Sequence, residues 1–179
     1  MRFGVYGWME MSHGSHEYMP KFWSAVVDLS TLIRFDYGLF TALFGKSHFF
    51  LNEQVWGLPP IFGLRGLPEN PSRNVLKDLE SDEEFCPTYL TYQEYLDIDW
   101  DEERYTSVHL GVIKEKVDEI LADCLGDVVV KRMHGVYHLY EKRKLKKFAR
   151  KGWVDVFRLM KYFANRYGED NVRIVVYFK

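Results

Sequence analysis

The stretch NVRIVVYFK, residues 171–179, is a nearly unbroken run of apolar and β-branched residues. Such a run is typical of a strand that is covered on both faces. We therefore expect a central strand of a sheet here. The segment before it, VDVFRLMKYFANRYG (154–168), has apolar residues at helical spacing and a glycine at its end, which predicts a helix that terminates at Gly168.

The first third of the chain supplies partners for that strand. RFGVYGWMEM (2–11) and FWSAVVDL (22–29) are rich in aromatic and β-branched residues, and turn-forming residues separate them. This pattern predicts a hairpin. Further strands are expected near residues 87–91, 105–111 and 127–133. The irregular order of strands and helices favours an α+β fold, in which a mixed or antiparallel sheet, formed by the N-terminal hairpin and the C-terminal strand, packs against about three to four helices.

Helix signals are clearest in three places. FDYGLFTALFG (35–45) has Asp36 near its start and Gly45 at its end, and GVIKEKVDEILADCLG (111–126) is amphipathic. Ser72 can cap a short helix, RNVLKDLE. Thr91, with Glu94 three residues later, has the form of a capping box. The basic stretch 137–152 is expected to be partly helical.

Composition bounds the class of protein. The 179 residues are 47% hydrophobic, 17% aromatic and 28% charged, which is typical of a globular chain; we expect a single domain over 1–179. Two cysteines imply no disulfide framework and fit a reducing compartment. The N-terminus lacks the apolar core of a signal peptide, and no run is long enough to cross a membrane. The sequence therefore predicts a protein of the cytoplasm.

Charge is distributed unevenly along the chain. Residues 69–103 carry twelve acids and two bases, a net charge of −10, and residues 131–151 carry nine bases and one acid, a net charge of +8. The two segments either face each other or face a partner. Because the whole chain is nearly neutral and no DNA-reading motif occurs, a local anion site is favoured over sequence-specific nucleic-acid binding.

IFGLRGLPENPS (61–72) ends a long ordered loop that we expect over 46–72. Arg65 stands between Gly63 and Gly66, and two prolines follow. Glycine permits unusual backbone angles and proline restricts them, so the loop is expected to hold one guanidinium in a set direction. Arginine grips carboxylates and phosphates with two hydrogen bonds. Arg65 either pairs with Asp36 or Asp99 and pins the loop, or faces an anionic ligand.

Four segments in chain order resemble a family of small phage and prophage proteins. They are RFDYGLFTALFG, PIFGLRGLPENPS, TYLTYQEYLDIDW and the terminal VRIVVYFK. Members of that family often begin with MGCDIH, carry RNYxLFxxLAG, PRGLP and HSxSWLT segments, and end in a strand similar to VRIVFWF. The resemblance covers the whole chain. It implies a phage accessory protein, for which evasion of host defence is a common role.

The chain also departs from the family pattern. It begins MRFGVYGWMEM and has FCPTYL in place of the histidine-containing HSxSW stretch, so the cysteine and histidines that could bind a metal are absent. The matching positions are instead arginines, an aspartate and aromatic residues, which are groups that grip ligands. His134 and His138 are spaced i, i+4, but no matching carboxylates or cysteines stand near them, so we expect neither a metal nor another cofactor.

We therefore expect a phage-encoded accessory protein that sequesters a small anionic, nucleotide-derived ligand without chemistry and forms a homo-oligomer. One alternative is a protein-interaction inhibitor that docks a host protein through a charged segment. Another is a nucleotide hydrolase that uses clustered carboxylates. The residues expected to bind the ligand are Arg34, Asp36, Tyr37, Arg65, Gly66, Tyr89 and Trp100, with possible phosphate contacts from Arg143 and Lys147.

Overall fold

The computed structural model describes residues 4–13, 21–45, 60–80, 86–124 and 127–178. The chain forms two compact units, Met1–Ile98 with Ala149–Lys179, and Asp99–Phe148. Each unit is described here by itself. Residues 46–59 of the predicted long loop lie outside the described residues.

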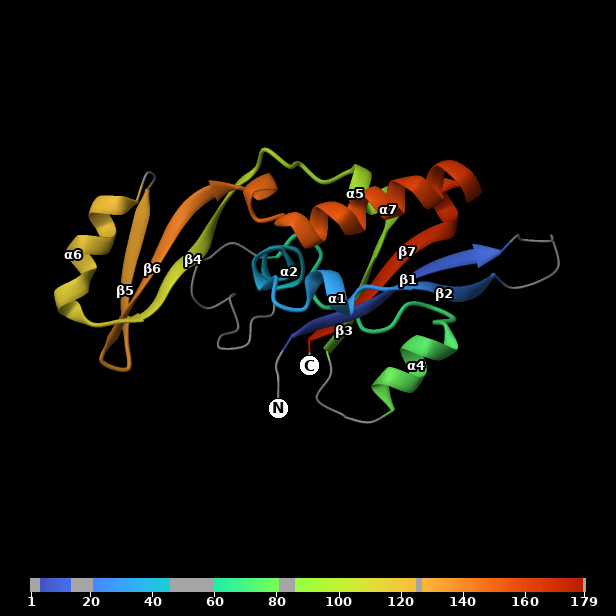
Figure 1. Cartoon of the computed structure of the whole chain (residues 1–179), viewed down its shortest axis with the longest axis horizontal. Coiled ribbons are helices and arrows are strands. Elements are labelled where there is room, and N and C mark those ends of the chain that lie inside the picture. Colours follow the sequence, from blue (N-terminus) through green and yellow to red (C-terminus); the bar gives the residue numbers. More distant parts are fainter. Residues whose placement is uncertain (1–3, 14–20, 46–59, 81–85, 125–126, 179) are drawn as a thin grey trace. The chain divides into compact units, whose positions relative to one another are not determined.

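The first unit contains a four-stranded antiparallel sheet (Figure 1). Its strands are β1 (Val5–His13), β2 (Phe22–Asp28), β3 (Cys86–Thr91) and β7 (Val172–Phe178), in the order β2-β1-β7-β3. All seven residues of β7 are buried, since β1 and β3 flank it and helices or loops cover both faces. The predicted hairpin, the central C-terminal strand and the α+β class are confirmed.

Helices α1 (Ser30–Ile33), α2 (Tyr37–Phe44) and α7 (Lys151–Tyr167) cover one face of this sheet (Figure 1). Their apolar residues form the main core with alternate residues of the strands. The largest fully buried side chains in it include Trp153, Phe40, Phe44, Met9 and Met160. The α7 helix approaches α1 closely at Gly152, where an added Cβ atom would lie 2.0 Å from the carbonyl oxygen of Leu32.

The opposite face is covered by residues 69–72 and by α4 (Arg73–Leu79). Between β3 and α7 the chain forms α5 (Tyr92–Leu96), and a 3-10 turn, η2 (Glu169–Asn171), leads into β7. The capping box predicted at the start of α5 is confirmed, because the Thr91 hydroxyl accepts from the Glu94 amide and the Glu94 carboxylate accepts from the Thr91 amide. Ser72 is the N-cap residue of α4, but its side chain makes no capping hydrogen bond.

The second unit is a three-stranded antiparallel sheet in the order β4-β6-β5, with one helix. Its elements are β4 (Glu103–Val112), α6 (Lys114–Asp123), β5 (Val128–Met133), β6 (Val136–Lys144) and the 3-10 turn η1 (Leu145–Lys147). The expectation of partial helix over 137–152 is wrong for residues 137–144. His134 and Gly135 both have positive φ, the geometry of a tight hairpin turn, and this turn returns the chain as β6 beside β5.

Candidate functional site

Arg65 is bound to an internal carboxylate. Its two terminal nitrogens donate to the two carboxylate oxygens of Glu94, with Nη2 to Oε2 at 3.1 Å, and Nη2 also donates to the backbone oxygen of Tyr89. The guanidinium lies 4.0 Å from the centre of the Tyr89 ring. Burial tends to raise the pKa of Glu94, but hydrogen bonds from Arg65 and Thr91 outweigh it and hold the pKa below its usual value. The loop is thereby pinned to β3 and α5.

These contacts favour the role in which Arg65 pins the loop by pairing with an internal carboxylate. That carboxylate belongs to Glu94 and not to Asp36 or Asp99. The backbone of the loop is tied to the same strand, since the Arg65 amide donates to the Thr88 hydroxyl and that hydroxyl donates to the oxygen of Gly63. Gly66 is exposed, with φ +76° and open space where a Cβ would stand. The ligand-binding roles of Arg65, Gly66 and Tyr89 stay predictions.

Arg34, Asp36 and Tyr37 lie together at the start of α2. The Arg34 guanidinium lies 5.1 Å from the centre of the Tyr6 ring on β1, whereas Arg65 lies against Tyr89 on β3, and β7 separates these two strands. Tyr37 packs on Phe178 with ring centres 5.7 Å apart, and burial raises its pKa.

Asp36 is 7% exposed, and neither of its carboxylate oxygens has a hydrogen-bond partner within the part of the chain that the structure describes. Its backbone oxygen accepts from the indole of Trp153 at 3.0 Å, which fixes the segment on α7. Burial raises the pKa of Asp36 to about 6, although the positive charge of Arg150 opposes this shift. Asp36 is therefore a carboxyl group that ionises near neutral pH.

Trp100, Arg143 and Lys147 belong to the second unit. Four bases of the basic segment form ion pairs with nearby acids. Lys144 and Lys146 both donate to Asp101, at 3.0 and 2.7 Å, and their hydrogen bonds hold the pKa of Asp101 below its usual value. Lys142 lies 3.1 Å from Glu103, and Arg143 pairs with Glu141. Part of the acidic segment (69–103) thus faces the basic segment (131–151). This is one of the two arrangements expected from the sequence, the other being that each segment faces a partner.

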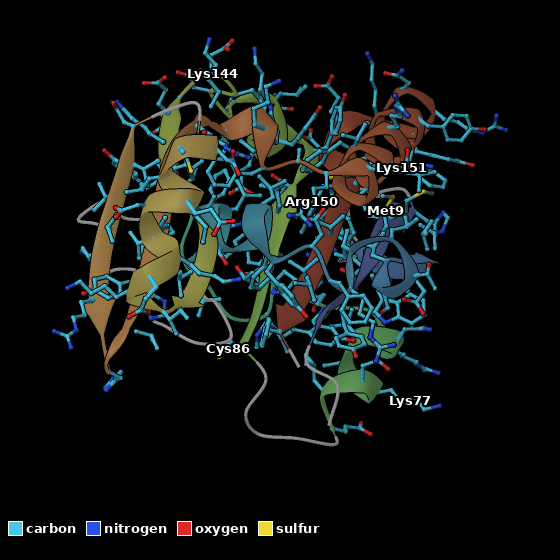
Figure 2. All side chains as sticks on the ribbon, turned by 60° about the vertical axis from the view of Figure 1, so that its left-hand side comes forward. Met9, Lys77, Cys86, Lys144, Arg150 and Lys151 are labelled. Carbon is cyan, nitrogen blue, oxygen red and sulfur yellow. The ribbon has the colours of Figure 1, made fainter. Side chains whose placement is uncertain are left out.

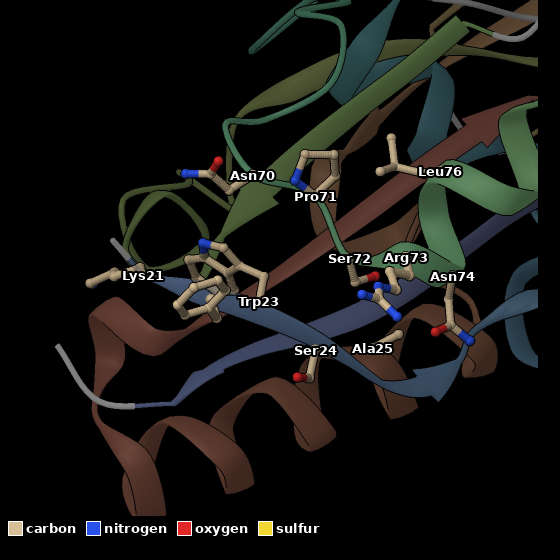
Figure 3. Close-up of a pocket in the computed structure, with 11 residues that line it drawn as sticks. Lys21, Trp23, Ser24, Ala25, Asn70, Pro71, Ser72, Arg73, Asn74 and Leu76 are labelled. Carbon is tan, nitrogen blue, oxygen red and sulfur yellow. The ribbon is translucent and has the colours of Figure 1, made fainter. Parts of the chain in front are cut away.

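The structure contains a groove that the sequence did not reveal (Figure 3). It has a volume of about 640 Å³ and lies between strand β2 and the segment that leads into α4. Two cations, two aromatic rings and several amide or hydroxyl groups line it, and no acidic side chain does. The lining residues are Lys21, Phe22, Trp23, Ser24, Ala25, Asn70, Pro71, Ser72, Arg73, Asn74 and Leu76.

A buried ion pair holds the two walls of this groove together. Arg173 of β7 donates from Nε to Glu10 of β1 at 2.7 Å, and its terminal nitrogens donate to the backbone oxygens of Glu69 and Asn70, each at 3.1 Å. The same guanidinium lies 3.8 Å from the centre of the Trp23 ring. Arg173 therefore fixes the indole in one wall and the backbone of the other.

Glu10 completes this arrangement, because its second carboxylate oxygen accepts from the amide of Ser72 at 2.6 Å. The hydroxyl of Ser72 is buried and makes no hydrogen bond within the described chain. A shared carboxylate at Asp78 holds α4 on the sheet beyond the groove: Trp8 and Tyr177 both donate to it at 2.7 Å. The groove is thus built on a rigid polar layer between the sheet and residues 69–78.

Among the residues that the structure describes, no three or more histidine, cysteine, aspartate or glutamate side chains are grouped as a metal site would need. Within the same residues, none of the helices has the length and apolar character that crossing a membrane requires. Comparison of the chain with family models, with curated proteins and with solved structures found no match.

Proposed function

We propose that this chain is a binding protein that holds a small anionic ligand with a planar ring in the groove between β2 and residues 70–76. The observation that carries the proposal is the lining of that groove. Lys21 and Arg73 supply positive charge, Phe22 and Trp23 supply rings, and no carboxylate competes with an anion. A nucleotide has the matching parts, namely phosphate oxygens and a flat base.

Trp23 is the expected stacking platform. One side of its indole is occupied by the Arg173 guanidinium at 3.8 Å, and the ring belongs to the wall of the groove. Stacking of a base on an aromatic side chain contributes about 1–3 kcal/mol per base. Because Arg173 holds the ring in place before any ligand arrives, binding costs little side-chain ordering.

Arg73 and Lys21 are the expected phosphate contacts. Arg73 is exposed and makes no ion pair within the described residues, unlike Arg65, whose fork is filled by Glu94. Lys21 donates to the backbone oxygen of Asp170 at 3.1 Å, a contact that leaves its charge unneutralised. The amides of Asn70 and Asn74 can add hydrogen bonds to ring or sugar oxygens.

The groove supports capture more than catalysis. Hydrolysis needs a general base or a metal-activated water, and the eleven lining residues include no histidine, cysteine, aspartate or glutamate. Together with the resemblance to small phage proteins, this supports a phage accessory protein that sequesters a nucleotide-derived signal of host defence. Sequestration requires affinity alone.

Isothermal titration with a panel of cyclic nucleotides and ADP-ribose derivatives tests the proposal. Arg73→Ala and Trp23→Ala are each expected to weaken binding at least tenfold. Lys77→Ala is the matched control, because Lys77 is a cation of the same helix (Figure 2) and is not one of the residues that line the groove. Binding that survives unchanged in a folded Trp23→Ala, Arg73→Ala double variant would overturn the assignment of this site.

A further inference from the structure

Ser72 lines the groove and carries a buried hydroxyl that the fold does not use. The residue is 4% exposed, and its hydroxyl oxygen makes no hydrogen bond within the described residues. Among the buried side-chain atoms that lack a partner in that part of the chain, it is the one that belongs to a groove-lining residue. A buried polar group without a hydrogen bond costs free energy. The hydroxyl is therefore expected to find its partner in the groove.

The backbone of Ser72 is held firmly on both sides of this hydroxyl. Its amide donates to Glu10 at 2.6 Å, and its carbonyl oxygen accepts from the amide of Leu76 at 3.1 Å. A serine at the N-cap of a helix commonly uses its side chain to cap the helix, but that of Ser72 makes no such bond. The hydroxyl is thus fixed in place and still available to a ligand.

The charges around Ser72 indicate which part of a ligand fits there. The Glu10 carboxylate lies at the Ser72 amide, and the Arg173 guanidinium that neutralises it is already bound to the backbone of residues 69–70. A phosphate at Ser72 would be close to a carboxylate of the same charge, which is unfavourable. Arg73, the next residue, is exposed and offers its guanidinium to the phosphate. A neutral polar atom suits Ser72 better.

Trp23 and Ser72 are joined through one set of contacts. The Arg173 guanidinium lies 3.8 Å from the centre of the Trp23 ring and donates to Glu10 at 2.7 Å, and Glu10 accepts from the Ser72 amide. Figure 3 shows Trp23 on β2 and Ser72 on the segment that forms the other wall. A ring that stacks on Trp23 can therefore present its edge to the wall that holds Ser72.

We propose that the Ser72 hydroxyl binds a neutral polar atom on the edge of the ligand's ring, and that the groove thereby selects a polar heteroaromatic ring over an apolar ring of the same size. This inference rests on the proposed function, in which the ring stacks on Trp23. A hydroxyl can donate or accept, so a ring nitrogen, an oxo group or an amino group can each pair with it. An apolar edge would leave the hydroxyl buried and unpaired, which is how a polar site rejects an analogue that lacks the matching group.

Isothermal titration with two probes tests the selection. Adenosine monophosphate and the monophosphate of benzimidazole riboside share the ribose and the phosphate, but the second has only carbon and hydrogen in its six-membered ring. The wild type is expected to bind the adenosine probe about tenfold more tightly or better, and Ser72→Ala should lose that preference. Ser30→Ala, on a serine of α1 that is not one of the lining residues, should keep it.

Thermal unfolding of Ser72→Ala gives a second readout. Because the hydroxyl makes no hydrogen bond within the described chain, its removal should leave the thermal midpoint unchanged or raise it. A clearly lower midpoint would show that the hydroxyl is already paired within the protein, and would overturn the inference.

The outcomes separate this inference from the proposed function. Equal binding of the two probes by the wild type, or a preference that persists in Ser72→Ala, would overturn selection by Ser72. The proposed function would then still stand if Trp23→Ala weakens the binding of both probes. Absence of binding by either probe would overturn the inference and the proposed function together.

Discussion

Arg173 on β7 donates to Glu10 on β1 over 2.7 Å, and their side chains are only 6% and 0% exposed. The pair joins two neighbouring strands, and both members also bind the backbone of residues 69–72. The loop that contains Arg65 is therefore held at its C-terminal end by Arg173, which lies more than a hundred residues further along the chain.

Glu10→Gln is expected to destabilise the chain by about 3–5 kcal/mol, because it leaves the Arg173 guanidinium buried without a counter-charge. Urea unfolding followed by circular dichroism measures the loss. Asp155→Asn is the control, since its partner Arg158 is 76% exposed and an exposed pair contributes less than about 1 kcal/mol. Equal, small effects of the two substitutions would contradict the anchoring role of Glu10.

Arg65→Ala is expected to release the loop while the sheet stays folded. The substitution removes hydrogen bonds to Glu94 and to the Tyr89 carbonyl, and hydrogen bonds that involve charged groups contribute about 1.5–3 kcal/mol each before allowance for their partial exposure to solvent. Hydrogen exchange should speed up in residues 62–67 and not in β7. Arg158→Ala should leave both regions unchanged. Unaltered exchange in residues 62–67 would show that Arg65 does not pin the loop.

Asp36→Asn is expected to alter the dependence of stability on pH. The pKa of Asp36 in the folded chain is about 6, above its ordinary value of 3.8, so ionisation of Asp36 disfavours the fold. The stability of the wild type relative to Asp36→Asn should therefore fall as pH rises from about 4 to about 6 and stay low above that. A pKa difference of about 2 corresponds to an upper limit of about 3 kcal/mol.

Unfolding of the two chains by urea at pH 4 and at pH 8 measures this effect. Comparing the variant with the wild type at each pH cancels the contribution of other carboxyls, such as Glu94, whose lowered pKa acts in the opposite direction. A difference between the two chains that is the same at both pH values would contradict the assignment.

Gly152→Ala is expected to separate α7 from α1. The new Cβ would lie 2.0 Å from the Leu32 oxygen, and this backbone atom cannot move aside without shifting a helix. Overpacking of this kind costs about 1–3 kcal/mol, more than alanine gains as a better helix former. A lower thermal midpoint measures it. Asn165→Ala, at an exposed position of the same helix, should leave the midpoint nearly unchanged or raise it.

Local signals in the sequence were sufficient for much of the fold. The apolar run at 172–178, the turn residues between β1 and β2, and the Thr91–Glu94 capping box each depend on neighbours within a few residues. Strand β6 was missed because its lysines and arginines resemble a helix face. The decisive feature was the tight turn at His134 and Gly135, which pairs β6 with β5.

The site was harder to predict because it depends on contacts between distant segments. The sequence alone points to Arg65 as a binding residue. Whether its guanidinium binds an internal carboxylate or a ligand depends on where Glu94 lies after folding. The groove joins Trp23 to Arg73 across fifty residues, and Arg173 fixes both of its walls. An available signal was the pair of large rings, Phe22 and Trp23, at the start of the edge strand β2.

Native mass spectrometry of the purified chain mixed with cyclic nucleotides and ADP-ribose derivatives tests the central claim most directly. The account predicts a complex whose ligand is recovered with unchanged mass after heat release, and loss of that complex in the Trp23→Ala, Arg73→Ala double variant but not in Lys77→Ala. Absence of any bound ligand would contradict the claim and favour a protein partner. A ligand of altered mass would show catalysis instead of capture.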